Sequence, residues 1–243
     1  MYPVICSIGP LKIYSYGLMV GIAFIVATYF ALKRASLFGI PKEVVNNLVI
    51  IFLISGILGA RILYVALNIN FFIANPSNIF MINRGGLVFY GGFIGALIAG
   101  IIYARAVKVS ILDAADLIVP FAALGHAIGR IGCFLNGCCY GKLTDSFIGV
   151  VFPNTFVKVY PSQLFSSAGL LIIFAILFRM QKHRRFKGQV LALYLISYGA
   201  FRFLIEFTRG DMLPVFYDIT VTQIISLVIM LCGINLYLWK RLS

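Results

Sequence analysis

The sequence predicts an all-α membrane protein, a polytopic bundle of about seven transmembrane helices. Hydrophobic residues occupy 62% of the 243 positions, charged residues occupy only 11%, and the mean hydropathy is +1.03. Soluble domains contain roughly 45–50% apolar and about 25% charged residues. So large an apolar share cannot be buried in a water-soluble core. The composition therefore excludes a soluble multidomain enzyme, a disordered chain and a disulfide scaffold.

Seven segments have the composition of membrane-spanning helices, each of which needs about 20 mostly apolar residues. They cover residues 13–32, 44–66, 86–104, 112–131, 163–178, 190–207 and 219–239. The first segment is not followed by a small-residue cleavage site, so we expect a retained helix and not a signal peptide. No internal repeat divides the chain, and we expect a single integral membrane domain over residues 1–243.

The basic residues predict the orientation of the bundle. Lys and Arg number 20 against 7 Asp and Glu. They are dispersed between the apolar segments, and most become cytoplasmic if the N-terminus lies outside and the C-terminus inside, as the positive-inside rule favours. The basic stretch 179–187 then anchors the chain at the inner leaflet, and we expect no nucleic-acid partner. The long loops 67–85 and 132–162 face outward, where they can lie over the mouth of the bundle.

Three arginines lie within the apolar segments: Arg61, Arg130 and Arg202. An ionisable residue in a membrane helix costs several kcal/mol, so it is a functional hypothesis by default. In the expected orientation all three lie in the outer half of the membrane. Arginine is always charged and binds phosphate through two parallel hydrogen bonds. The sequence therefore predicts an anion site at the depth of the lipid headgroups, suited to a phospholipid phosphate.

The sixth segment carries a polar stripe on an otherwise apolar helix. Tyr198, Arg202 and Glu206 follow one another at intervals of four residues, so they share one face. One interpretation is a structural ion pair between Arg202 and Glu206 that joins two helices. The other is that the stripe belongs to the anion site.

The fourth segment also contains ionisable residues. Ser110 and Asp113 have the spacing of a capping box at its inner start, where the carboxylates of Asp113 and Asp116 favour the helix dipole. His126 precedes Arg130 by one turn, and its position fits either a packing residue or a base.

Three cysteines, Cys133, Cys138 and Cys139, follow the fourth segment closely. Structural zinc sites usually contain paired CxxC ligands. The CxxxxCC spacing lacks them, so we expect no metal site, and we expect no cofactor. Oxidation outside the cell could join Cys133 to Cys138 or Cys139. A membrane thiol-disulfide oxidoreductase is therefore an alternative function, and a non-catalytic phospholipid-binding protein is another.

Six motifs, in order along most of the chain, resemble those of the bacterial prolipoprotein diacylglyceryl transferases. They are Tyr14-Ser-Tyr16-Gly17-Leu18, Gly56–Tyr64, Gly85-Gly86-Leu-Val-Phe-Tyr90-Gly91-Gly92, Gly129-Arg130-Ile-Gly132 through Asn136-Gly137 to Gly141, Tyr160-Pro161-Ser162-Gln163-Leu164-Phe165, and Tyr198-Gly199-Ala-Phe201-Arg202-Phe-Leu-Ile-Glu206. The resemblance implies a multi-pass enzyme of the bacterial inner membrane whose active site faces the outer leaflet.

The implied reaction moves diacylglyceryl from phosphatidylglycerol to the lipobox cysteine thiol in the signal peptide of a prolipoprotein. A thioether forms and glycerol phosphate leaves. The partners are then phosphatidylglycerol, prolipoprotein signal peptides and membrane lipids. The resemblance assigns Arg130 and Arg202 to the lipid phosphate, and Glu206 to the orientation of Arg202. It assigns catalytic or substrate-binding roles to a further set of residues: Tyr16, Tyr90, Gly132, Asn136, Gly141, Ser162, Gln163 and Tyr198.

Four positions depart from the family pattern. Tyr90 and Tyr160 stand where the family usually has histidine, and Cys133 and Cys138 replace an asparagine and a glutamate. Tyrosine, with a reference pKa of about 10, is a poor general base near neutral pH. The proton of the acceptor thiol can then go to one of these tyrosines, if neighbouring arginines lower its pKa, or to His126. Alternatively, the positive electrostatic field of the arginines itself favours loss of the thiol proton.

Overall fold

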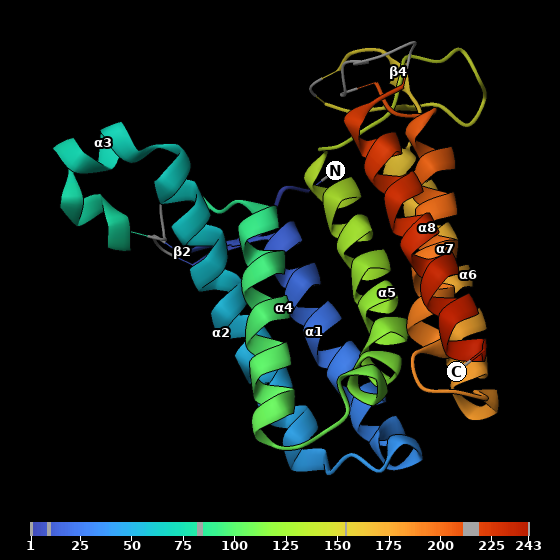
Figure 1. Cartoon of the computed structure of the whole chain (residues 1–243). Coiled ribbons are helices and arrows are strands. Elements are labelled where there is room, and N and C mark those ends of the chain that lie inside the picture. The colour runs from blue at the N-terminus through green and yellow to red at the C-terminus, as the bar shows by residue number, and fades with distance from the viewer. Residues whose placement is uncertain (1, 9–10, 82–84, 154, 211–218, 243) are drawn as a thin grey trace. The chain divides into compact units, whose positions relative to one another are not determined.

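A computed structural model (Figure 1) describes residues 2–8, 11–81, 85–153, 155–210 and 219–242 of the chain. Its long helices are α1 (Ser15–Arg34), α2 (Lys42–Leu67), α4 (Phe89–Ala106), α5 (Ile111–Asn136), α6 (Ser162–Met180), α7 (Gln189–Glu206) and α8 (Val221–Leu242). Within the described residues, all seven are long and apolar enough to cross a membrane. The prediction of a seven-span, all-α membrane protein is confirmed.

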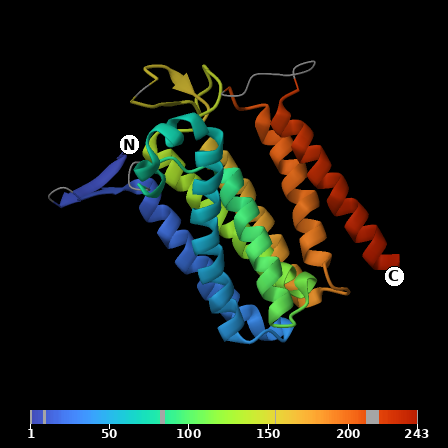
Figure 2. The ribbon, with the colours of Figure 1, turned by 60° about the vertical axis from the view of Figure 1, so that its left-hand side comes forward.

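Short elements that the hydropathy pattern did not predict connect the long helices. A hairpin of β1 (Val4–Ile8) and β2 (Leu11–Tyr14) precedes α1 (Figure 2). The other short elements are the 3-10 helices η1 (Ala35–Phe38), η2 (Pro76–Phe80) and η4 (Gln181–His183), the helix α3 (Ile69–Ala74), and the paired strands β3 (Val150–Val151) and β4 (Lys158–Val159). One long helix also differs from its expected length: α5 continues past residue 131 to Asn136, which places Cys133 on the helix.

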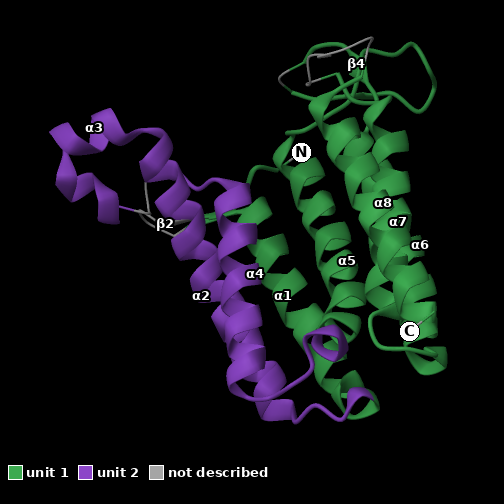
Figure 3. Ribbon diagram, viewed as in Figure 1, with its two compact units in different colours: residues 1–37, 115–243 green, residues 38–114 purple. Residues whose placement is uncertain are grey.

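The chain divides into two compact units, one of residues 1–37 and 115–243 and one of residues 38–114 (Figure 3). The smaller unit holds α2, α3 and α4, and the larger unit holds α1, most of α5, and α6 to α8. The expectation of a single domain over the whole chain stays a prediction.

In the smaller unit, glycines bring α2 and α4 into close contact. A Cβ atom on Gly95 would lie 2.7 Å from the carbonyl oxygen of Ser55, and one on Gly92 would lie 2.9 Å from that of Gly56. Gly91 packs against Gly59 in the same way. Small residues spaced four apart allow membrane helices to approach at backbone distance, where dispersion attraction is strongest. These glycines therefore serve helix packing.

In the larger unit, an aromatic cluster joins α1, α5 and α6. The ring of Phe30 on α1 lies 6.4 Å from both Phe121 on α5 and Phe174 on α6, and 6.1 Å from Phe178 on α6. The Ser167 hydroxyl on α6 donates a 3.0 Å hydrogen bond to the carbonyl of Ala127 on α5. These contacts fix α5, the helix that carries Arg130, between two neighbours.

Helices α7 and α8 lie side by side in the same unit (Figures 1 and 2). Gly199 approaches the carbonyl of Ser226, and Gly233 approaches that of Ala192, so a Cβ on either glycine would fall within 2.9 Å of a main-chain oxygen. The start of α7 is held from α5. The buried carboxylate of Asp116 accepts 2.8 Å hydrogen bonds from the main-chain N–H groups of Gly188 and Leu191.

Asp116 therefore differs from its expected role at the start of its own helix. It satisfies unpaired N–H groups at the first turn of α7, where a carboxylate also favours the dipole. Arg184 pairs with the same carboxylate at 3.2 Å. At the start of α5, the hydroxyl of Ser110 accepts a 3.4 Å hydrogen bond from the N–H of Asp113, as the capping box predicts.

We expect Gly91→Ala to destabilise the protein by about 1–3 kcal/mol, as overpacking does in close-packed interiors. The new Cβ would lie 2.5 Å from the Cβ of Leu63 and would also clash with the carbonyl of Gly59. Gly21→Ala on α1 is the matched control, because no atom lies within 4 Å of its added Cβ. Unfolding with sodium dodecyl sulfate from detergent micelles measures both. Equal midpoints for the two variants would contradict the packing role of Gly91.

Candidate functional site

The candidate site begins with two pairs of side chains on α5 and α7. The rings of His126 on α5 and Tyr198 on α7 lie 6.0 Å apart. Arg130 and Arg202 follow them by four residues each, which is one helical turn. Because the two helices run in the same direction, both arginines reach the same level, and their guanidinium groups interact electrostatically. The structure thus brings together Arg130, Arg202 and Tyr198, while their predicted roles toward substrate stay predictions.

Each arginine has a partner that fixes its position. The Nε of Arg130 donates a 3.3 Å hydrogen bond to Nε2 of His126. The Nη1 of Arg202 lies 2.5 Å from Oε2 of Glu206, so the ion pair forms, although within α7 and not between two helices. A guanidinium has further N–H groups beyond these contacts, and these can bind a phosphate oxygen.

Glu206 also pairs with a second arginine, Arg209, which lies just beyond the end of α7. Arg209 Nε lies 3.9 Å from Oε2 of Glu206, and the Thr220 hydroxyl donates a 3.1 Å hydrogen bond to Oε1. Glu206 and Arg209 are both buried. The three-residue spacing from Glu206 was the available sequence signal for Arg209. The single carboxylate thus holds two guanidinium groups at this end of α7.

Tyr16, on the first turn of α1, belongs to the same cluster. Its side chain is 46% exposed and interacts electrostatically with Arg130. Gly132 on α5 explains this proximity, because a Cβ there would lie 2.9 Å from the Cβ of Met19 and 3.5 Å from the Cα of Tyr16. The visible role of Gly132 is therefore to let α5 approach α1.

A left-handed turn ends α5 and reverses the chain. Asn136 is the last helical residue, and Gly137 has φ of +73°. The N–H of Gly137 donates to the carbonyl of Phe134 and the N–H of Cys138 donates to that of Cys133, both at 3.1 Å. This pair of bonds is the Schellman motif, which closes many helix C-termini. The turn returns Cys138 to the side of Cys133, one helical turn back.

The turn therefore brings the three cysteines together. The Sγ atoms of Cys133, Cys138 and Cys139 all lie within 4.8 Å of one another, and the thiols are free. We call these three residues the cysteine cluster. Burial raises the pKa of the Cys138 thiol. A hydrogen bond from Cys133 lowers the pKa of Cys139, and Arg130 and Arg209 lower it further.

Residues at the start of α6 support the loop that carries Cys138 and Cys139. The buried Gln163 donates a 2.6 Å hydrogen bond from Nε2 to the carbonyl of Cys138. The Ser162 hydroxyl lies 3.5 Å from the carbonyls of Tyr160 and Thr208. A Cβ on Gly141 would collide with Ser162 and Thr208, so only glycine fits there. Ser162, Gln163 and Gly141 thus position the loop, while their predicted contact with substrate stays a prediction.

Comparison with known proteins decides the family. The sequence profile described as prolipoprotein diacylglyceryl transferase matches residues 3–239. The chain belongs to the prolipoprotein diacylglyceryl transferase family. It is similar to phosphatidylglycerol–prolipoprotein diacylglyceryl transferase 2 of Clostridium perfringens, with 38% identity over 96% of this chain and 93% of the relative. The corresponding transferases of Clostridium tetani (36% identity, 98% of this chain and 97% of the relative) and Pseudoalteromonas translucida (38% identity, 98% and 92%) are also similar.

Two candidate functional residues, Tyr90 and Arg61, lie in the smaller unit. Tyr90 is 60% exposed on the first turn of α4. Arg61 on α2 is 8% exposed, and its guanidinium donates five hydrogen bonds to main-chain carbonyls. The acceptors are those of Asn78, Ile79, Met81, Gly85 and Gly86, at 2.6–3.3 Å. Because these bonds use the whole donor set of arginine, Arg61 stabilises its loop and does not contribute to the predicted anion site.

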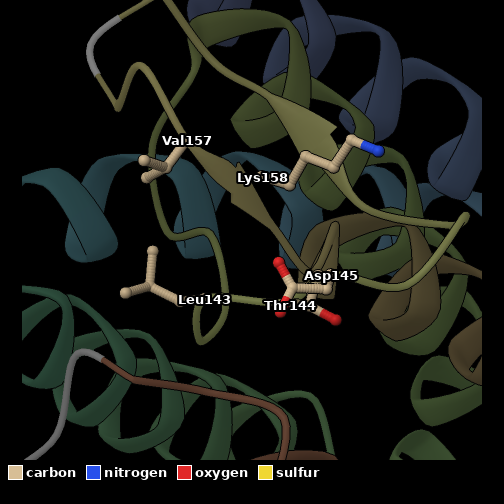
Figure 4. A pocket seen from close by; sticks show the side chains of 5 residues that line it. All are labelled: Leu143, Thr144, Asp145, Val157 and Lys158. Atoms are coloured by element: carbon tan, nitrogen blue, oxygen red, sulfur yellow. The ribbon is translucent and has the colours of Figure 1, made fainter.

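The loop between α5 and α6 contains a hollow that is separate from the candidate site. Its lining consists of Leu143, Thr144, Asp145, Val157 and Lys158 (Figure 4). None of the predicted site residues lines it. We therefore do not assign the substrate to this hollow.

We expect Arg61→Lys to loosen the loop that Arg61 holds. Lysine offers three donors from one nitrogen and cannot reproduce the five N–H donors of a planar guanidinium. Hydrogen exchange of amides in residues 76–81 and 85–88 should then rise roughly tenfold or more, since bonds to a charged group contribute about 1.5–3 kcal/mol each. Arg105→Lys, at the last turn of α4, is the control. Unchanged exchange in Arg61→Lys would show that the loop does not depend on the guanidinium.

We expect Glu206→Gln to lower stability by about 3–5 kcal/mol, because removing one partner of a buried ion pair leaves uncompensated charge. Here two arginines lose the same carboxylate. Thermal unfolding in detergent measures the loss, with the exposed Glu43→Gln on α2 as the control. The double variant Arg202→Met with Glu206→Gln should recover part of the stability. A stable Glu206→Gln would exclude a structural role for the pair.

Proposed function

We propose that the protein transfers the diacylglyceryl group of phosphatidylglycerol to the lipobox cysteine thiol of a prolipoprotein. The observation that carries this is the adjacency of Arg130 and Arg202 on α5 and α7 in a chain of the transferase family. The thiol loses its proton and the sulfur attacks a glycerol carbon. The bond from that carbon to the phosphate oxygen breaks, and glycerol phosphate leaves with the electron pair. The product is a thioether.

The arginines suit this step because negative charge grows on the departing phosphate. Cations that are already in place in a water-poor site stabilise such charge without reorganisation. Glu206 holds Arg202. We assign Arg130 and Arg202 to the lipid phosphate, and Tyr16 and Tyr198 to hydrogen bonds with the headgroup. Gly132, Asn136, Gly141, Ser162 and Gln163 complete the proposed substrate-binding set.

The acceptor thiol needs a way to lose its proton. His126 Nε2 already accepts a hydrogen bond from Arg130, and a second cation beside the guanidinium would be unfavourable. We therefore assign His126 to the positioning of Arg130. Proton loss is assisted by the field of the two arginines. The catalytic role that the family motif implies for Tyr90 stays a prediction.

The proposed setting is the inner membrane of a bacterium, with the N-terminus outside and the active site toward the outer leaflet. The distribution of Lys and Arg supports this orientation. The acceptor is then a prolipoprotein signal peptide that presents its cysteine from the membrane. The two alternative functions, a thiol-disulfide oxidoreductase and a lipid-binding protein without catalysis, find no support in the transferase names of the relatives.

A mass assay tests the function. The purified protein is mixed with phosphatidylglycerol and a synthetic lipobox peptide, which should gain the mass of one diacylglyceryl group. Arg130→Ala or Arg202→Ala should each slow the reaction about 100-fold to 1000-fold, as the loss of one electrostatic donor does in acyl transfer. Lys142→Ala and Arg185→Ala should have little effect. Peptide of unchanged mass with folded wild-type protein would overturn the transferase, and full activity of both arginine variants would overturn the site.

A further inference from the structure

The cysteine cluster has no role in the proposed transfer, yet it is the densest group of nucleophilic side chains in the described part of the chain. Cys133 and Cys138 are partly buried, and Cys139 is exposed. All three Sγ atoms lie within 4.8 Å of one another. The remaining cysteines, Cys6 and Cys232, are exposed on β1 and α8.

The main chain holds the three thiols in this arrangement. The Schellman bonds from Gly137 and Cys138 place Cys138 beside Cys133. Cys139 then has φ of +62°, a conformation uncommon outside glycine, so the surrounding structure must stabilise it. Gln163, buried on α6, fixes the carbonyl of Cys138 by a 2.6 Å hydrogen bond. The cluster is therefore organised by two helices before any ligand arrives.

The distances between the Sγ atoms suit one bound metal ion, which can accept all three thiolates, whereas a disulfide bond joins only two of them. Three thiolates that bind one ion at about 2.3 Å lie roughly 3.8–4.0 Å apart. The separations of up to 4.8 Å need a contraction of less than about 1 Å to reach this. Thiolates are soft ligands that select copper(I) and zinc(II) among biological cations.

The surroundings also favour a bound cation with three thiolates. The excess negative charge of three thiolates would be offset by Arg130 and Arg209, both of which interact electrostatically with Cys139.

We propose that the cysteine cluster binds one soft d10 metal ion, zinc(II) or copper(I), through the three Sγ atoms. Binding releases the thiol protons to solvent, and water can occupy the fourth position on zinc. The inference does not depend on the transferase reaction. It also revises the expectation drawn from the CxxxxCC spacing, because the helix-ending turn supplies the proximity that sequence distance does not.

Zinc binding to the full-length protein in detergent tests the proposal. The protein is reduced with a phosphine, which leaves no competing thiol, and titrated with zinc against a chromophoric chelator. We expect one equivalent of tightly bound zinc, with three sulfur neighbours in its X-ray absorption spectrum. Cys133→Ser, Cys138→Ser and Cys139→Ser should each weaken binding by roughly 100-fold or more, since each removes a direct ligand, beyond the 10-fold to 100-fold typical of outer-shell changes. Cys6→Ser and Cys232→Ser are the matched controls and should bind as the wild type does.

A second measurement on the wild type alone guards against variants that fail to fold. Added zinc should protect Cys133, Cys138 and Cys139 from alkylation by iodoacetamide, mapped by peptide mass, while Cys6 and Cys232 react as before. A copper(I) titration against a copper chelator identifies the preferred ion, and tight binding of either ion supports the site. No tight binding of either ion to the reduced protein, or retained zinc affinity in all three cluster variants, would overturn it.

Discussion

The placement of guanidinium groups within apolar helices is the constraint on which the rest of the structure depends. Each arginine within a span must be compensated, since an unpaired charge there is costly. Arg202 is paired with the carboxylate of Glu206, Arg61 donates to main-chain carbonyls, and Arg130 donates to His126. These three ways of compensating an arginine have different consequences for phosphate binding. Arg61 has no donor to spare, whereas Arg130 and Arg202 keep N–H groups that a phosphate can use.

Close helix contacts give these charges a fixed geometry. The approach of α5 to α1 at Gly132 places Tyr16 near Arg130, and the carboxylate of Asp116 on α5 fixes the start of α7. Because α7 begins at a point set by α5, Tyr198 and Arg202 lie level with His126 and Arg130. A phosphate site made of side chains from two helices needs such a fixed register, since misplacement by about 1 Å can cost 100-fold in rate.

The end of α5 shows how a backbone motif creates chemistry. Position C3 and position C″ of a Schellman motif commonly hold apolar residues in contact. Here they are Cys133 and Cys138, so a local folding device becomes a pair of neighbouring thiols. The next residue, Cys139, adds the third. The same turn leads into Gly141, whose lack of a side chain lets the loop pack against Ser162 and Thr208.

The sequence by itself determined the class of protein, the seven spans and the cap at Ser110, and it offered the pairing of Arg202 with Glu206 as one of two interpretations. These depend on composition and on residues within a turn or two of each other, so periodicity reveals them. Only the tertiary structure decided that Arg61 holds a loop, that Asp116 caps α7 and that Gln163 supports the loop that carries the three cysteines. Asp116 and Leu191 are 75 positions apart, and Gln163 and Cys138 are 25 apart. Such contacts exist only after the helices have packed, because hydropathy specifies which residues enter the membrane and not which neighbours they find there.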